Sequence, residues 1–457
     1  MFTITATAYV VILIITTKIH LSKTLFDPFD PFWVFIGIYS VYAWSGIISV
    51  ELAQDIAYVG VPVSAEAKCI YCVAINLGLL GFAIGYHWVL GKSLVIYRGI
   101  EMWLIKIPPR IFANILLAVA VVISLIFLPD LLKSIYPRMA ISYKDIGGMM
   151  RLEWAADEYS GLIEYMQHIP ITLLIASLFL RIEKHGVGIW SLLFVICLAL
   201  NSITSLKSGG RGPLIFNLFL MLSFYHYYKK KLRLPLLLAV ALPLYLVGTT
   251  IQHVRSDNDL QSMFHHAISL ISDNPLLLLP TNVGEFAAPS GNLLILIDSI
   301  KEGSLTYYTW GYSILTEIAT FIPRFLFPGR PVPLPEQFTQ ICLPDLYFDG
   351  RGAGFFLLME GYWSFGIIGV FLQMVAWGAV VGMMYSILLR NLSYRHVLLL
   401  YSLVYPIIVV FSIRTGFIGS IKSAMMELSP IIFIMLCSGF VTSRKRIRNK
   451  HMTIVMH

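Results

Sequence analysis

Long apolar stretches separated by short polar connections dominate the chain. A stretch of about 20 apolar residues is long enough to cross the hydrocarbon layer of a bilayer as an α-helix. The first stretch has neither a basic start nor a small-residue cleavage site, so we expect a span and not a signal peptide. The pattern predicts about 11 transmembrane helices, within a range of roughly 10–14, near residues 3–20, 32–50, 69–90, 111–130, 167–182, 188–206, 212–228, 234–251, 363–388, 396–413 and 419–441.

This pattern predicts an all-α polytopic membrane protein. A spanning helix satisfies its backbone hydrogen bonds internally, whereas an outer-membrane barrel would show short segments of alternating polarity. The composition agrees, with 58% hydrophobic residues, 13% charged residues and a mean hydropathy of +0.78. The net charge of +8 comes from basic clusters between spans and near the C-terminus. Such clusters are typical of cytoplasmic anchoring and do not indicate a nucleic-acid-binding protein.

The basic connections define an orientation, because all of them fall on one side of the predicted spans. If that side is cytoplasmic, the N-terminus lies outside and the C-terminus inside. The chain then divides into an N-terminal bundle of about eight spans at 1–251, a large outside loop at 252–362 and a C-terminal bundle of about three spans with a basic tail at 363–457. The first bundle includes a further outside segment at 131–166. In the large loop, stretches such as "YSILTEIATFIPRFLFP" are too interrupted to span, so we expect interfacial or re-entrant helices.

Two glycine pairs predict close helix packing within the bundle. Gly81-x-x-x-Gly85 lies in the third predicted span, and Gly378-x-x-x-Gly382 lies in the ninth. Small residues at this spacing let two helix backbones approach each other.

Arginines are unexpectedly frequent on the outside, where the positive-inside rule predicts few of them. A guanidinium group binds phosphate oxygens through paired hydrogen bonds and stays charged at any relevant pH, so these arginines indicate a phosphorylated ligand. The alternative is solvated charge or structural ion pairs with the acids of the loop. The set comprises Arg211, Arg255, Arg324, Arg330, Arg351 and Arg414.

Arg211 lies in "SLKSGGRGPLIF", between two predicted spans. Pro213 suits the first turn of a helix, so the seventh span is expected to begin here with its N-terminus facing outside. Exposed amides and the positive end of the helix dipole favour an anion at such a position.

Acid and base candidates must also lie outside. Glu360, in "LLMEGYW", falls where the ninth span begins, so it is the first candidate for a proton acceptor. Its alternative role is an ion pair with one of the arginines. Weaker candidates are His253, Glu285 and Asp349.

Together these segments resemble the Wzy-type O-antigen and oligosaccharide repeat-unit polymerases. The likeness rests on the Gly-Gly-Arg211 turn, the long outside loop, "FIPRFLFPGRP" and the segment Glu360-Gly361-Tyr362 followed by "WSFGIIG". The enterobacterial common antigen polymerase is similar in its Gly-Gly-x-Arg turn, although this chain lacks the extra residue.

The resemblance implies a membrane glycosyltransferase of the GT-C type in the bacterial inner membrane, with its N-terminus and active site periplasmic and its C-terminus cytoplasmic. It implies transfer of the growing undecaprenyl-diphosphate-linked glycan to the non-reducing end of an incoming lipid-linked repeat unit, without metal or nucleotide. Catalytic roles would fall to Glu360, Arg211 and Arg351. The remaining arginines, with His253, Glu285, Asp349 and Tyr362, would bind diphosphate or glycan.

The implied partners are the lipid-linked donor and acceptor, membrane lipids and a chain-length regulator and flippase of the same pathway. Two other functions stay open from the sequence. An O-antigen ligase would use the same donor but transfer the glycan to lipid A core. A lipid-linked oligosaccharide flippase or transporter would carry charges at the centres of several spans and show two related halves.

Overall fold

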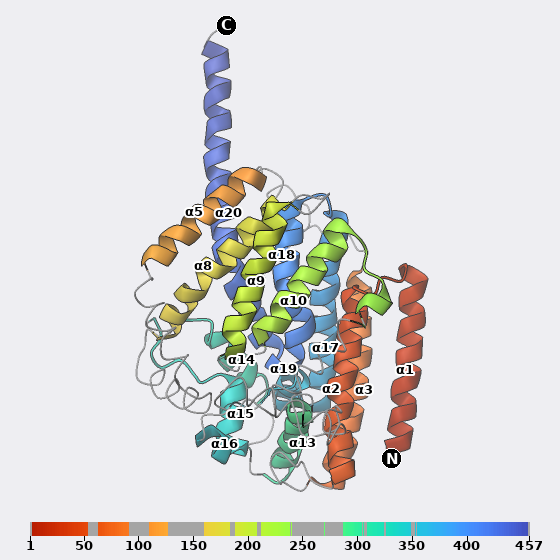
Figure 1. The fold of residues 1–457 in the computed structure, drawn as a ribbon. Helices are drawn as coiled ribbons and strands as arrows, with labels where there is room; N and C mark the ends of the chain where they lie inside the picture. Colours follow the sequence, from red (N-terminus) through yellow and green to blue (C-terminus); the bar gives the residue numbers. More distant parts are fainter. Residues whose placement is uncertain are drawn as a thin grey trace.

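The structure is a computed structural model, and Figure 1 shows its fold. It describes residues 2–53, 63–90, 109–126, 160–182, 188–207, 212–237, 239, 269, 287–303, 305, 309–323, 326–348, 352 and 354–455. In these ranges the chain is helical apart from turns, short connections and one isolated bridge between Phe355 and Thr415.

The helices form a bundle whose members differ in length and role. The N-terminal part contains α1 (Phe2–Lys23), α2 (Pro31–Ala53), α3 (Ala65–Val89), α5 (Pro109–Ile126), α8 (Ser160–Arg181), α9 (Ile189–Lys207), α10 (Gly212–Phe224) and the π-helix η1 (Tyr225–Lys229). The predicted outside loop contributes α13 (Ala287–Lys301), α14 (Tyr312–Ala319), α15 (Leu334–Cys342) and α16 (Pro344–Phe348). The C-terminal part contains α17 (Leu358–Arg390), α18 (Arg395–Tyr405), the π-helix η3 (Pro406–Phe411), α19 (Ser412–Thr415) and α20 (Phe417–Val455).

Six of the described helical segments are long and apolar enough to cross a membrane, namely Thr3–Lys23, Ala65–Val89, Pro109–Ile126, Leu358–Arg390, Arg395–Thr415 and Phe417–Ser438. Large apolar side chains are exposed on several of them, including Ile14 on α1 and Leu125 on α5. Apolar surface of this kind belongs in contact with lipid. These features define a multi-pass membrane protein. The predicted number of about 11 spans stays a prediction, and most of the predicted span at 234–251 lies outside the described residues.

Helices α3 and α17 pack backbone to backbone through the two predicted glycine pairs. A Cβ atom on Gly85 would collide with the Val375 carbonyl, and one on Gly378 would collide with the Phe82 carbonyl. Gly81 and Gly382 also face backbone carbonyls across this contact. The prediction of close helix packing is therefore confirmed, because no larger side chain fits between these helices.

Helix α17 contains a sharp turn that its unbroken apolar sequence does not reveal. Phe365 and Gly366 leave the helical region, with φ 63° and ψ −146° at Gly366, a conformation that favours glycine. Gln373 Nε2 donates to the Leu357 carbonyl at 2.6 Å. Residues this far apart in sequence would be separated by about 24 Å in a straight helix. Residues 358–364 therefore form a short helix that folds back against the long part of α17.

The region predicted as a large outside loop also contains a deeply buried helix. α13 packs against α2 and α3 and lies at the end of the bundle where α14, α15 and α16 also gather (Figure 1). Asn292 Nδ2 donates to the Gly354 carbonyl at 2.6 Å, and Ser64 Oγ donates to Asp298 at 2.5 Å. This segment is thus partly built into the bundle.

Candidate functional site

The predicted site residues divide into those that the structure describes and those that it does not. Glu360, Tyr362, Arg330 and Arg414 are described. Seven others lie outside the described residues, namely Arg211, Arg255, Arg324, Arg351, His253, Glu285 and Asp349. α10 begins at Gly212, as the Pro213 signal predicted.

Glu360 lies in the short helix of α17 and contacts the first turn of α20. Its carboxylate accepts hydrogen bonds from the Phe417 amide at 2.7 Å and the Ile418 amide at 3.2 Å. Gln373 Nε2 lies 3.4 Å from the same oxygen, and the Glu360 side chain is only 2% exposed. A carboxylate at this position satisfies free amides and meets the positive end of the helix dipole.

These contacts give Glu360 a structural role, since it caps α20 from a neighbouring helix. The glycine before α20 makes this approach possible. Gly416 has φ +82°, and a Cβ atom there would lie 2.5 Å from Glu360 Oε1. The role of Glu360 as a base stays a prediction.

Tyr362 and Arg414 flank this helix cap. Tyr362 is 1% exposed and belongs to the hydrophobic core. Arg414 is half-buried in α19, where its backbone carbonyl accepts from the Phe355 amide at 3.0 Å. The segment 355–357 is thereby held beside α19, just before the short helix that carries Glu360.

Arg330 closes the end of α14. Its Nη1 atom donates to the carbonyls of Thr320 and Ile322, each at 3.0 Å. A cation at a helix C-terminus complements the carbonyls that lack an intrahelical partner. Arg330 is half-buried, so its side chain lies partly inside the protein, next to the end of α14.

Two further charged groups, which the sequence analysis did not single out, lie next to Arg330. Glu317 is 3% exposed and accepts from the Leu334 amide at 2.7 Å. Lys422, in α20, donates from Nζ to Thr320 Oγ1 at 3.1 Å. Burial raises the pKa of the Glu317 carboxyl above its usual range, against the opposing influence of the Leu334 amide, Lys422 and Arg330.

We call this group the α14 polar cluster; it comprises Glu317, Thr320, Arg330 and Lys422. Glu317 also lies close enough to Glu360 for their charges to interact. The cluster therefore connects the end of α14, the loop before α15 and the first turns of α20. It brings opposite charges together at the end of the bundle formed by α13–α16, where Lys301 of α13 also pairs with Glu66.

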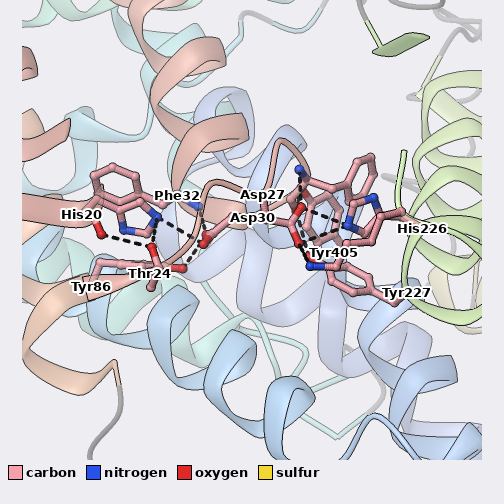
Figure 2. A network of polar contacts seen from close by, with 11 residues as sticks. His20, Thr24, Asp27, Asp30, Phe32, Tyr86, His226, Tyr227 and Tyr405 are labelled. Atoms are coloured by element: carbon pink, nitrogen blue, oxygen red, sulfur yellow. Dashed lines mark hydrogen bonds and ion pairs between the residues drawn. The ribbon is translucent and has the colours of Figure 1, made fainter. Parts of the chain in front are cut away.

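A second polar network lies around the connection between α1 and α2 (Figure 2). Asp27 pairs with His226 at 2.9 Å, and Asp30 pairs with His20 at 3.2 Å. Tyr86 donates to Asp30 at 2.6 Å. The network joins α1, α2, α3 and η1 through almost fully buried side chains, so it fixes the positions of these helices.

The pKa of Asp27 shows that its neighbours in this network stabilise the charged carboxylate. Burial alone would raise that pKa, but the hydrogen bond and charge of His226, the Phe29 amide and Lys231 together lower it. Asp27 is therefore ionised in the folded protein at neutral pH. We assign the network to the stability of the bundle.

The helical fold, the apolar outer surface and the buried charges define a multi-pass α-helical membrane protein with a polar cluster at one end of its bundle. The family model described as "O-antigen polysaccharide polymerase Wzy" matches residues 2–445, and the chain belongs to that family. The predicted family is thus confirmed, and with it a glycosyltransferase-type polymerase of polysaccharide synthesis in a membrane. Comparisons with curated proteins and with solved structures find no match. The narrower likeness to the enterobacterial common antigen polymerase stays a prediction.

Proposed function

We propose that this protein polymerises O-antigen at the periplasmic face of the bacterial inner membrane. It transfers the growing undecaprenyl-diphosphate-linked glycan to the non-reducing end of an incoming lipid-linked repeat unit. The observation that carries the proposal is the family match over nearly the whole chain. The grouping of charged side chains at the end of the bundle formed by α13–α16 supports it, because a diphosphate leaving group needs positive charge.

In this proposal the N-terminus is periplasmic, the C-terminus is cytoplasmic and the helices form a GT-C-type architecture of about 11 spans. The described basic residues support the orientation. Lys23 precedes the α1–α2 connection, Lys229, Lys230 and Lys231 follow α10, and Arg390 and Arg395 flank the α17–α18 connection. None of these connections belongs to the end formed by α13–α16.

The arginines bind the two lipid diphosphates of donor and acceptor. Each of these two diphosphates is bound by some of the residues Arg211, Arg255, Arg324, Arg330 and Arg351. Further residues contribute to glycan or diphosphate binding, namely Arg414, His253, Asp349, Glu285 and Tyr362. The contacts of Glu360 support its role in positioning, because it holds the first turn of α20 in place. The reaction proceeds without metal or nucleotide, in cooperation with a flippase and a chain-length regulator.

Deletion of the gene tests this function through the surface polysaccharide separated on a gel. We expect lipopolysaccharide capped with a single repeat unit and no longer chains. Complete loss of capping with accumulation of long lipid-linked chains would instead identify a ligase. Loss of both capping and lipid-linked polymer would identify a flippase.

Complementation of the deletion strain then tests Arg211. Arg211→Ala is expected to abolish the long chains, and Arg211→Lys to restore them poorly at normal expression, because lysine lacks the paired donors of a guanidinium group. Full activity of the alanine variant would exclude the diphosphate role of Arg211.

A further inference from the structure

Helix α14 has its polar face buried and its apolar face exposed. The buried face comprises Ser313, Thr316 and Glu317, each at most 6% exposed, and it continues to Thr320. Tyr312 is 67% exposed, Leu315 65% and Ile318 50%. The two sets recur at helical spacing, so they lie on opposite sides of the helix.

This arrangement is the reverse of that of a helix on a water-soluble protein. Exposing apolar side chains to water is unfavourable, whereas exposing them to hydrocarbon is not. The outer side of α14 therefore faces lipid. The exposed surface continues beyond the helix and comprises Trp310, Tyr312, Leu315, Ile318, Ile322, Leu326 and Phe327, which we call the α14 apolar strip.

The inner side of α14 contacts a lysine in a membrane-spanning segment. Lys422 lies in the span Phe417–Ser438, and its Nζ atom donates to Thr320 Oγ1 at 3.1 Å. Among the described residues, no carboxylate lies within ion-pair distance of Lys422. An ionisable side chain in a span is costly unless it binds a partner or serves a site.

Arg330 adds a second positive charge close to Lys422. Both cations bind Thr320, Arg330 at its carbonyl and Lys422 at its hydroxyl, and Glu317 precedes Thr320 by about one helical turn. One oxygen of Glu317 is engaged by the Leu334 amide. The α14 polar cluster thus places two cations next to each other beside an apolar surface.

We propose that the α14 apolar strip and the pair Lys422–Arg330 form one binding site for a polyprenyl diphosphate. The two parts meet beyond the end of α14, where Arg330 donates to the carbonyl of Ile322, a residue of the strip. The strip contacts the polyprenyl chain, and Lys422 and Arg330 bind the diphosphate. The ligand is taken to be lipid-linked because the inference rests on the proposed function. A diphosphate matches two neighbouring cations better than the single phosphodiester of a phospholipid does, since it carries more negative charge.

Binding measurements on the full-length protein in phosphatidylcholine nanodiscs test the site. The probes are undecaprenyl diphosphate, inorganic diphosphate and phosphatidylglycerol. We expect Lys422→Met to weaken binding of both diphosphates about tenfold or more, because a charge-assisted hydrogen bond is lost. Lys422→Arg should retain most of the affinity. The matched control is Lys301→Met, which removes a partly buried lysine of α13 that pairs with Glu66 and is expected to leave binding unchanged.

A second variant in the same experiment tests the α14 apolar strip. Leu315→Ser should weaken the binding of undecaprenyl diphosphate several-fold and leave the binding of inorganic diphosphate unchanged. Only undecaprenyl diphosphate has a polyprenyl chain that can contact the strip. Equal melting temperatures of the variants exclude misfolding as the cause.

Three results would overturn the inference. Wild-type affinity in a correctly folded Lys422→Met variant would show that Lys422 does not bind the diphosphate. Equal weakening by Lys301→Met would show a general charge effect. Displacement of undecaprenyl diphosphate by an equal concentration of phosphatidylglycerol would make the site a general anionic-lipid site. The proposed function fails separately, because a deletion strain that keeps its long chains refutes the polymerase and leaves the binding data intact.

Discussion

The carboxyl group of Glu360 accepts hydrogen bonds from two backbone amides at the first turn of α20, and this explains why an acidic residue is tolerated at a buried position. The sequence drew attention to Glu360 as a proton acceptor. That role stays a prediction. Its contacts add a second role, because they hold the first turn of α20 and thereby the part of this helix that carries Lys422.

Glu360→Gln separates the two roles. If Glu360 positions α20, the variant should lose about 1 kcal/mol of stability, as for loss of a helix cap, and keep part of its polymerase activity. Thermal melting and chain-length analysis of the complemented strain measure both effects. Complete loss of polymer with an unchanged melting temperature would assign the proton-acceptor role to Glu360.

Glu317 makes stability depend on pH. Its folded-state pKa lies above the ordinary value of 4.5, so its contribution to stability is present below that value and is lost as pH rises through the raised pKa. The neutral variant Glu317→Gln does not titrate. Its melting temperature relative to wild type should therefore increase between pH 4.5 and pH 8. A difference that stays constant over this range would show that Glu317 does not titrate as its burial indicates.

At the scale of elements, the contact of α3 with α17 depends on glycine. Gly378→Ala would place a methyl group against the Phe82 carbonyl and force the helices apart. We expect a loss of about 1–3 kcal/mol in unfolding free energy. Gly37→Ala in α2 is the matched control, since a Cβ atom there meets nothing within 4 Å. Chemical denaturation in detergent measures both variants, and equal stability of the two would contradict the described packing.

Some elements were predictable from the sequence and others were not. The glycine pairs and the start of α10 at Gly212 could be predicted because they follow from local backbone requirements. The turn at Phe365–Gly366 could not, because the apolar sequence continues through it and only contacts such as that of Gln373 with Leu357 reveal the reversal. The interior position of α13 likewise depends on packing against α2 and α3.

The same holds for the candidate site, because its residues could be recognised in the sequence but their contacts could not. The polar residues at 313, 316, 317 and 320 recur at helical spacing, and Lys422 stands within a predicted span, so both signals were present in the sequence. What the sequence could not supply was the contact of Lys422 with Thr320, because it joins segments far apart in the chain. The resemblance to the polymerase family was available from short motifs and is confirmed over residues 2–445.

At the scale of the whole molecule, the proposed lipid-diphosphate site lies at the end of the bundle formed by α13–α16. The Asp27 and Asp30 network stabilises the connection between α1 and α2 (Figure 2). Polymerisation is the property that this arrangement is proposed to serve. It is best tested with the purified full-length protein, since the cell contains other enzymes acting on the same lipids.

The most direct measurement is reconstitution of the protein in liposomes with undecaprenyl-diphosphate-linked repeat units as the only substrate. We predict a ladder of lipid-linked glycans differing by one repeat unit, with one undecaprenyl diphosphate released for each unit added. The ladder should form in the presence of a chelator and without nucleotide. Products that never exceed a single repeat unit, from a correctly folded protein, would contradict the polymerase assignment.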